Sequence, residues 1–417
     1  MNHSQTKPPL WLWGMANATY GLVAGYVFVP LPQMLVARGL PQDRIDAIVA
    51  NCLLTGFWAF LISPVVDVRF SRRWYTVFFA LLAGIALYAA LQCMHSIPWF
   101  EAWLIIANAA GIMSSNALGG WLATIIQREH EAPMSAWTQV AAFIGYGTMA
   151  ILPAELAPRL SPQAIAILLG ALVALPAVVC AVIPMPAYEI AEAKRLAASF
   201  RAFGSELKIL LKRREVLLAL PLFLAPTASF ALTNNLSGLG KDFHASNLFV
   251  SRASGVFLAV AGLPGCLAMY LLARRIRPLP LYFVIGIAGA LFTLSLLALP
   301  KTPFTFGAAV LGENIFQATA YTTAVAIAFQ TIGRENPLAG TQFGLLTAAT
   351  VLPINYMGRL DGWAYTHGGL SREITTDALV SLAACALLAP LILSRRTRAS
   401  LSASGNGGGS NGGSSGL

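Results

Sequence analysis

The chain has 417 residues, of which 57% are hydrophobic and only 11% are charged, and its mean hydropathy is +0.68. This composition leaves too little polar surface to cover a soluble globule of that size, so it excludes a soluble protein and indicates an integral membrane protein. The net charge of +10 is explained by basic groups in the predicted connections, so no binding of nucleic acid is expected.

Apolar runs of about 20 residues recur along the chain, which is the length that a helix needs to cross the hydrocarbon core. They predict an all-α membrane protein with twelve transmembrane helices in two pseudo-symmetric halves of six. The predicted spans are residues 10–36, 45–66, 75–93, 99–126, 136–154 and 163–186, then 216–239, 247–273, 279–299, 303–331, 339–357 and 375–394.

A polar stretch divides the two halves. Residues 1–187 are predicted to form an N-terminal six-helix bundle, 188–215 a cytoplasmic amphipathic linker and 216–398 a C-terminal six-helix bundle. From residue 399 to 417 the chain is rich in Gly and Ser, which predicts a flexible, disordered tail.

The linker has apolar residues at three- and four-residue steps, which is the period of a helix with one apolar face. These residues are Leu196, Phe200, Phe203, Leu207 and Leu210. Such a helix suits the headgroup layer, with its basic groups towards anionic lipid. A solvated linker helix explains the pattern equally well.

The two halves are similar in sequence at corresponding positions. A shift of 203 places Gln127 on Gln330 and Thr138 on Thr341, near the fourth-to-fifth and tenth-to-eleventh connections. Parallel duplication of six spans, with a substrate held at the midplane between the halves, is an architecture of transporters.

Basic residues are concentrated in the even-numbered connections. Those connections contain Arg69, Arg72, Arg73, Arg128 and the basic cluster of the linker, whereas the odd-numbered ones have only scattered Lys and Arg. By the positive-inside rule we expect both termini and the linker in the cytoplasm.

The loop Ser63–Trp74 combines an acid, Asp67, with Arg69, Arg72 and Arg73. An acid at a helix end followed by arginines can bridge helix ends at the inner mouth and release them when the halves rock apart. We therefore predict a cytoplasmic gate here. The alternative is ordinary positive-inside charge.

Glu313 is the only acid that the predicted spans place well inside the membrane. A carboxylate in hydrocarbon is costly unless it is protonated, paired or facing water, so Glu313 is a candidate proton-coupling residue. Asn314, Gln317 and Tyr321 extend a polar stripe along the same span. The alternative is an acid that only holds helices together through hydrogen bonds.

Other polar and aromatic residues inside the spans are candidates for cargo binding. Each is as consistent with a hydrogen bond between helices as with a cargo contact. They are Asn17, Tyr20, Asn108, Ser115, Asn116, Gln139, Tyr146, Thr227, Phe230 and Asn234, together with Asn314, Gln317 and Tyr321. This set has no cluster of buried Arg or Lys, so it favours a largely neutral, aromatic or amide-bearing cargo over a phosphorylated one.

The loop at 63–74 resembles the signature loop of the major facilitator superfamily, although Ser63-Pro64 replaces the usual glycine-rich opening. The resemblance covers residues 9–396. It implies the major facilitator fold, with spans one, four, seven and ten lining the cavity. Together with residues 30–41, the loop looks more like the branch of muropeptide permeases, acetyl-CoA transporters and siderophore permeases, above all the pyochelin- and rhizobactin-type permeases.

The resemblance implies a monomeric secondary transporter of the bacterial inner membrane that takes up a siderophore or a metal-siderophore complex with protons. A muropeptide importer and a drug or metabolite exporter are the alternatives within the superfamily. A membrane-embedded enzyme or sensor is the alternative outside transport.

Signatures of catalysis and of cofactor binding are absent from the sequence. It has no phosphate-binding loop and no HExxH motif, and its five cysteines lack metal-ligand or disulfide spacing. We therefore expect no enzyme activity, no catalytic residue, no cofactor and no metal site.

Overall fold

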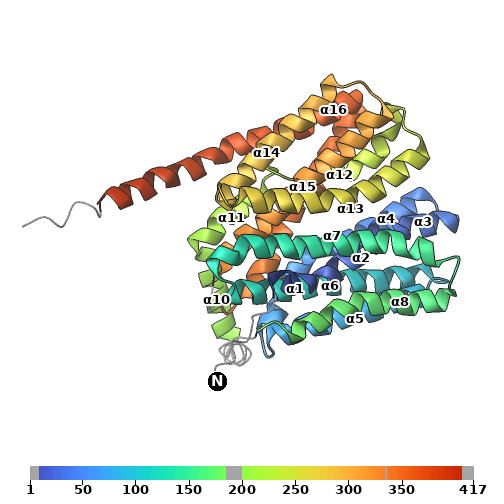
Figure 1. Cartoon of the computed structure of the whole chain (residues 1–417), viewed down its shortest axis with the longest axis horizontal. Coiled ribbons are helices and arrows are strands. Elements are labelled where there is room, and N and C mark those ends of the chain that lie inside the picture. Colours follow the sequence, from blue (N-terminus) through green and yellow to red (C-terminus); the bar gives the residue numbers. More distant parts are fainter. Residues whose placement is uncertain (1–8, 185–199, 334–335, 406–417) are drawn as a thin grey trace, which may run out of the picture.

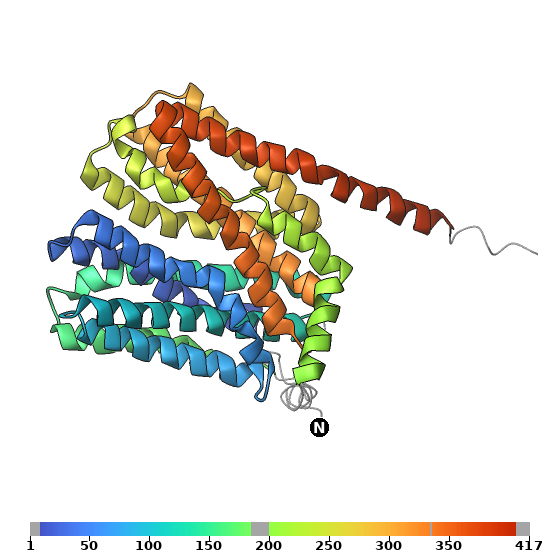
Figure 2. The same cartoon turned by 180° about the vertical axis from the view of Figure 1, so that it is seen from behind.

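The computed structural model describes residues 9–184, 200–333 and 336–405, and within them every regular element is a helix. The helices form two bundles that lie side by side, one built from α1–α8 and the other from α11–α16 (Figures 1 and 2). The described helices overlap all of the predicted spans. The all-α architecture expected from the composition is therefore confirmed.

The N-terminal bundle contains one interrupted span and several continuous ones. The first span is divided at Asn17 and Val29, where the backbone hydrogen bonding is broken before Pro30. The elements of the N-terminal bundle are α1 (Leu10–Met15), α2 (Ala18–Phe28), α3 (Pro30–Ala37), α4 (Gln42–Trp58), η1 (Ala59–Leu61), η2 (Ser63–Asp67), α5 (Arg72–Gln92), α6 (Ile97–Ile125), η3 (Arg128–His130), α7 (Glu131–Leu156), α8 (Pro162–Ala174) and η4 (Leu175–Ala181).

The C-terminal bundle follows the linker helix α10 (Phe200–Lys212). Its last element, α16, is two helices that meet at Gly369, whose φ of 66° favours glycine. The elements are α11 (Arg214–Leu224), α12 (Leu232–Asn235), η5 (Leu236–Phe243), α13 (Asn247–Leu272), α14 (Pro278–Ser295), η6 (Leu296–Ala298), α15 (Pro303–Ile332) and α16 (Ala339–Gly405).

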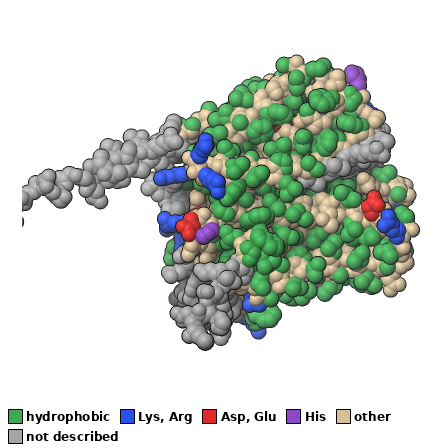
Figure 3. All heavy atoms as spheres, viewed as in Figure 1, with side chains coloured by type: hydrophobic (Ala, Val, Ile, Leu, Met, Phe, Trp, Pro, Cys, Tyr) green, Lys and Arg blue, Asp and Glu red, His purple; other side chains and the backbone are tan. Residues whose placement is uncertain are grey.

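The surface of the two bundles is that of a membrane protein. In the described residues, six helices are long and apolar enough to cross a bilayer. Hydrophobic side chains cover the middle of the face in Figure 3, and charged side chains gather towards its two ends. Because lipid is as apolar as these side chains, such a surface is stable only in a membrane.

Close contacts between small residues hold neighbouring spans together in the N-terminal bundle. Gly21 of α2 lies directly against the backbone of Ala142 in α7, and Gly25 lies against Tyr146 in the same way. Gly145 of α7 likewise lies directly against the backbone of α2. In lipid, helices associate through such close packing and not through the hydrophobic effect.

Two expectations about boundaries are corrected. The eleventh span does not end at residue 357 but continues to Gly368, and Asp361 on this extension is buried. Residues 399–405, expected in the disordered tail, continue the last helix. In the linker, Leu210 of the predicted apolar face packs on Leu338.

Candidate functional site

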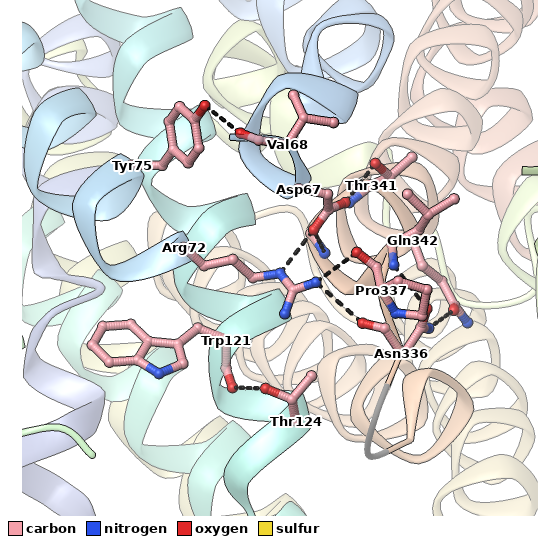
Figure 4. Close-up of polar contacts among 12 residues, drawn as sticks. Asp67, Val68, Arg72, Tyr75, Trp121, Thr124, Asn336, Pro337, Thr341 and Gln342 are labelled. Atoms are coloured by element: carbon pink, nitrogen blue, oxygen red, sulfur yellow. Dashed lines mark hydrogen bonds and ion pairs between the residues drawn. The ribbon is translucent and has the colours of Figure 1, made fainter. Parts of the chain in front are cut away.

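The two bundles are joined at one end by Asp67, the last residue of η2 in the N-terminal bundle. Its Oδ1 accepts a hydrogen bond from the N–H of Gly340 at 3.0 Å, and its Oδ2 accepts two from the N–H and hydroxyl of Thr341, both at 2.6 Å (Figure 4). Gly340 and Thr341 form the first turn of the eleventh span in α16. Unpaired N–H groups and the helix dipole make this turn favourable for an anion.

Arg72, at the start of α5, completes this contact. Its Nε donates to Asp67 Oδ1 at 2.7 Å, and its Nη2 donates to the carbonyls of Asn336 and Pro337 at 3.1 and 2.9 Å (Figure 4). Asp67 and Arg72 are each only 3% exposed. We call Asp67, Arg72 and residues 336–341 the inter-bundle contact.

Glycine residues allow the two bundles to pack closely at this contact. A Cβ at Gly340 would collide with Val66, and a Cβ at Gly120 of α6 would collide with the backbone of Gly340. Nearby, Asn116 of α6 donates to Ser63 at 3.0 Å and accepts from Thr347 of α16 at 3.4 Å. The closed end is therefore packed over several turns.

The other two arginines of the predicted gate do not cross to the C-terminal bundle in the contacts described. Arg69 has a φ of 72° and places its guanidinium over Phe70 at 5.3 Å. Arg73 donates to the carbonyl of Ala181 in its own bundle at 3.4 Å. In the contacts described, Asp67 and Arg72 are therefore the members of the predicted gate that reach the start of α16.

Three predicted tyrosines converge between the bundles. Tyr20 of α2 lies near Tyr146 of α7 and near Tyr321 of α15. Tyr20 exposes 36% of its surface, which places it beside an open space. Gln139 lies two turns before Tyr146 on the same face of α7 and is half-buried. These residues are the described candidates that fit a cargo cavity.

Several other candidates instead connect helices. Asn17 donates to the carbonyl of Thr138 at 3.0 Å and accepts from Ser115 at 2.8 Å, and Asn108 donates to Thr55 at 2.6 Å. Buried amides and hydroxyls with such partners act between helices. The same holds for Asn116, above. Thr227 and Asn314 instead bond within their own spans, to the carbonyls of Leu222 and Val310.

The seventh and tenth spans meet through Gln317, which donates to Thr233 at 2.8 Å. Phe230 stacks on Phe316 of α15, with ring centroids 5.9 Å apart, and so belongs to the packing of the C-terminal bundle. The side chain of Asn234 lies outside the described residues.

Glu313 faces the interior of the C-terminal bundle. It is 0% exposed, and its Oε1 accepts from Thr293 of α14, while Oε2 has no hydrogen-bond partner in the described residues. Asp377 of the twelfth span lies near it. Because each step of four residues advances about 40° around a helix, Gln317 and Tyr321 lie progressively further around α15 from Glu313.

Three further buried acids, Asp361, Glu373 and Asp377, were missed in the sequence. They are 0%, 1% and 3% exposed. The prediction ended the eleventh span at residue 357 and began the twelfth at 375, which placed the first two in a loop. Gly369 was the signal in the sequence that could have found them, because extending both helices to this glycine places all three acids inside helices. In the described residues, no group of His, Cys, Asp and Glu has the arrangement of a metal site.

Comparison with known proteins identifies the family. The family model of the Major Facilitator Superfamily matches residues 13–355, which is most of the chain. The protein belongs to the major facilitator superfamily. A search of curated proteins gave no match.

Solved structures of other transporters share this fold. The transporter FucP, in its outward conformation, has a TM-score of 0.68 and 16% identity, covering 92% of this chain and 98% of FucP. The proton:xylose symporter XylE has a TM-score of 0.69 and 14% identity, with 91% and 95% covered. A bacterial homologue of the iron transporter ferroportin, in its outward-facing state, has a TM-score of 0.64 and 14% identity, with 91% and 98% covered.

Membership in the superfamily settles the broad class of function. This protein is a multi-pass membrane transporter and not an enzyme. It moves a small-molecule substrate, and secondary transport is the activity of the symporters that it resembles.

Proposed function

We propose that the protein is a secondary active transporter of the bacterial inner membrane that couples proton entry to uptake of a siderophore or its metal complex. The observation that supports this best is the inter-bundle contact. Asp67 reaches Thr341 only while the bundles touch at this end, so opening of the contact would expose the midplane to that side, as alternating access requires.

Proton coupling is assigned to Glu313. A fully buried carboxyl with one unpartnered oxygen is stable when neutral and costly when charged, so its protonation state responds to any change in its surroundings. The solved structures with this fold include proton symporters, which is consistent with the assignment.

A siderophore is favoured as cargo by the residues around Tyr20 and by the loops at 30–41 and 63–74, which resemble those of siderophore permeases. Tyr20, Tyr146, Tyr321 and Gln139 offer aromatic faces and an amide, which suit an aromatic chelator. The proposal further places both termini and the inter-bundle contact on the cytoplasmic side and treats the protein as a monomer.

Glu313→Gln is expected to abolish the proton dependence of uptake. The purified protein is reconstituted in liposomes, and uptake of radiolabelled ferric pyochelin is measured with and without an imposed pH gradient. We expect at least a tenfold loss of gradient-driven uptake, with counterflow retained, because counterflow needs no net proton movement. Glu155→Gln, at an exposed acid of α7, is the matched control.

Unchanged proton dependence in Glu313→Gln contradicts the coupling assignment. Absence of counterflow with ferric pyochelin in the wild-type protein contradicts the cargo assignment. Counterflow with a muropeptide or a drug in the same vesicles would then identify the alternative class.

Gln139→Ala is expected to weaken cargo binding without weakening the fold. Gln139 has no hydrogen-bond partner in the described residues and lies on the face of Tyr146, so its loss removes a contact worth about 1 kcal/mol, or roughly fivefold in KM. Asn108→Ala removes the bond to Thr55 and should instead lower the melting temperature. KM for counterflow and thermal unfolding in detergent separate the two effects, and a fall in the melting temperature of Gln139→Ala would contradict a cargo role.

A further inference from the structure

Four buried carboxyl groups lie near one another in the C-terminal bundle. Glu313 is on α15, and Asp361, Glu373 and Asp377 are on α16, each 3% exposed or less. Asp377 is close enough to influence the charge of the other three. Such a concentration of acids in a membrane is expensive unless something neutralises it.

The break at Gly369 brings Asp361 and Asp377 to the same depth. Each is eight positions from Gly369, on antiparallel helices, so each lies about 12 Å below the turn. Their side chains are within hydrogen-bonding reach of each other. The fold therefore pairs these two carboxyl groups directly.

No donor group satisfies this pair in the described residues. Both oxygens of Asp361 and Oδ1 of Asp377 are buried without a partner, and no Lys or Arg of the described residues forms an ion pair with either. Two carboxylates at this range in a dry interior cannot both be charged. A proton between them satisfies both, because a carboxylic acid donates and a carboxylate accepts.

A chain of polar groups leads from this pair towards the end of the molecule opposite the inter-bundle contact. Glu373, one turn nearer Gly369, accepts from Asn235 at 3.2 Å. Beyond it, Asp242 of η5 is half-buried and accepts from Tyr365 at 2.9 Å. In the other direction, Asp377 lies near Glu313. Asp242 is thus half-buried, whereas the acids further along the chain of groups are fully buried.

We propose that Asp361 and Asp377 form a second proton-binding site, which holds one shared proton and passes protons from the Asp242 end to Glu313. This inference rests on the proposed proton coupling and adds its route. Protons would move inside the C-terminal bundle, while the cargo moves between the bundles near Tyr20.

In the described residues, the titratable groups near the pair are acidic: Glu313 on α15 and Glu373 on α16. Asp242 on η5 and Tyr365 on α16 lie beyond Glu373. Arg372, at the break, instead places its guanidinium over Trp363, 5.5 Å from the ring centroid.

Infrared spectroscopy of the purified protein tests the shared proton without any cargo. The wild-type protein at neutral pH should show a carbonyl band of a protonated carboxyl group. Asp361→Asn and Asp377→Asn should each remove that component, whereas Glu155→Gln should not. Thermal unfolding identifies a variant that has lost its fold. The infrared band of the other variant then tests the shared proton.

The band decides between a proton and a metal cation. If Asp361→Asn and Asp377→Asn both keep the wild-type band, the proposal is overturned. It is equally overturned if the wild-type protein has no such band and its melting temperature rises with Na⁺ or K⁺, since a metal cation would then neutralise the pair.

The route is tested by ferric pyochelin uptake in liposomes. Asp361→Asn should reduce gradient-driven uptake at least tenfold and leave counterflow within about twofold. If Asp361→Asn keeps full proton dependence while Glu313→Gln loses it, the second site is wrong and the proposed function stands. If Glu313→Gln keeps proton dependence, the proposed coupling fails regardless of the infrared result.

Discussion

Asp67→Asn is expected to open the inter-bundle contact and shift the protein towards the conformation that is open at that end. Asp67 provides all acceptors for Gly340 and Thr341. Arg72 lies in the same bundle as Asp67, so their ion pair persists when the bundles separate and stabilises both conformations about equally. The bonds from α16 to Asp67 exist only in the closed conformation. Asp67→Asn removes their charge-assisted part, which destabilises the closed conformation by about 2 kcal/mol, or roughly 30-fold in the conformational equilibrium.

Spin labels at Gln127 and Gln330 measure this shift. Both residues are exposed, at the ends of α6 and α15 on opposite sides of the interface. The distance distribution should lengthen in Asp67→Asn. Arg73→Gln is the matched control in the same loop, because Arg73 bonds to Ala181 within its own bundle. An unchanged distribution in Asp67→Asn would show that the contact does not hold the bundles together.

Gly21→Ala is expected to destabilise the whole protein. A Cβ at this position would overlap the carbonyl oxygen of Ala142, and a backbone atom in the middle of α7 cannot move aside as a side chain can. Separating α2 from α7 costs about 2–3 kcal/mol, which lowers the melting temperature by roughly 3–8 °C.

Thermal unfolding in detergent measures this loss, with Gly111→Ala as the control. A Cβ at Gly111 of α6 meets Val23 at 3.6 Å, which is ordinary van der Waals contact. The two variants make the same change in helix propensity, so their difference isolates the steric effect. Equal melting temperatures would mean that α2 and α7 are not packed as closely as Gly21 indicates.

Sequence alone predicted the spans because their cause is local. In lipid every backbone N–H and C=O group must be bonded within its own segment, so an apolar run of sufficient length is a helix whatever its neighbours are. The family resemblance was equally readable, since Asp67 and Arg72 occur in one short loop. The pattern of one acid followed by arginines indicated a gate before its partners were known.

Only the tertiary structure decided what those residues meet. Thr341, the partner of Asp67, is 274 positions away, and nothing in the loop distinguishes Arg72, which crosses to the other bundle, from Arg73, which does not. Glu313 was recognised as buried, but its neighbours Thr293 and Asp377 were not predicted. Periodicity defines the faces of a helix, while the rotation of each helix against its neighbours depends on packing with distant segments.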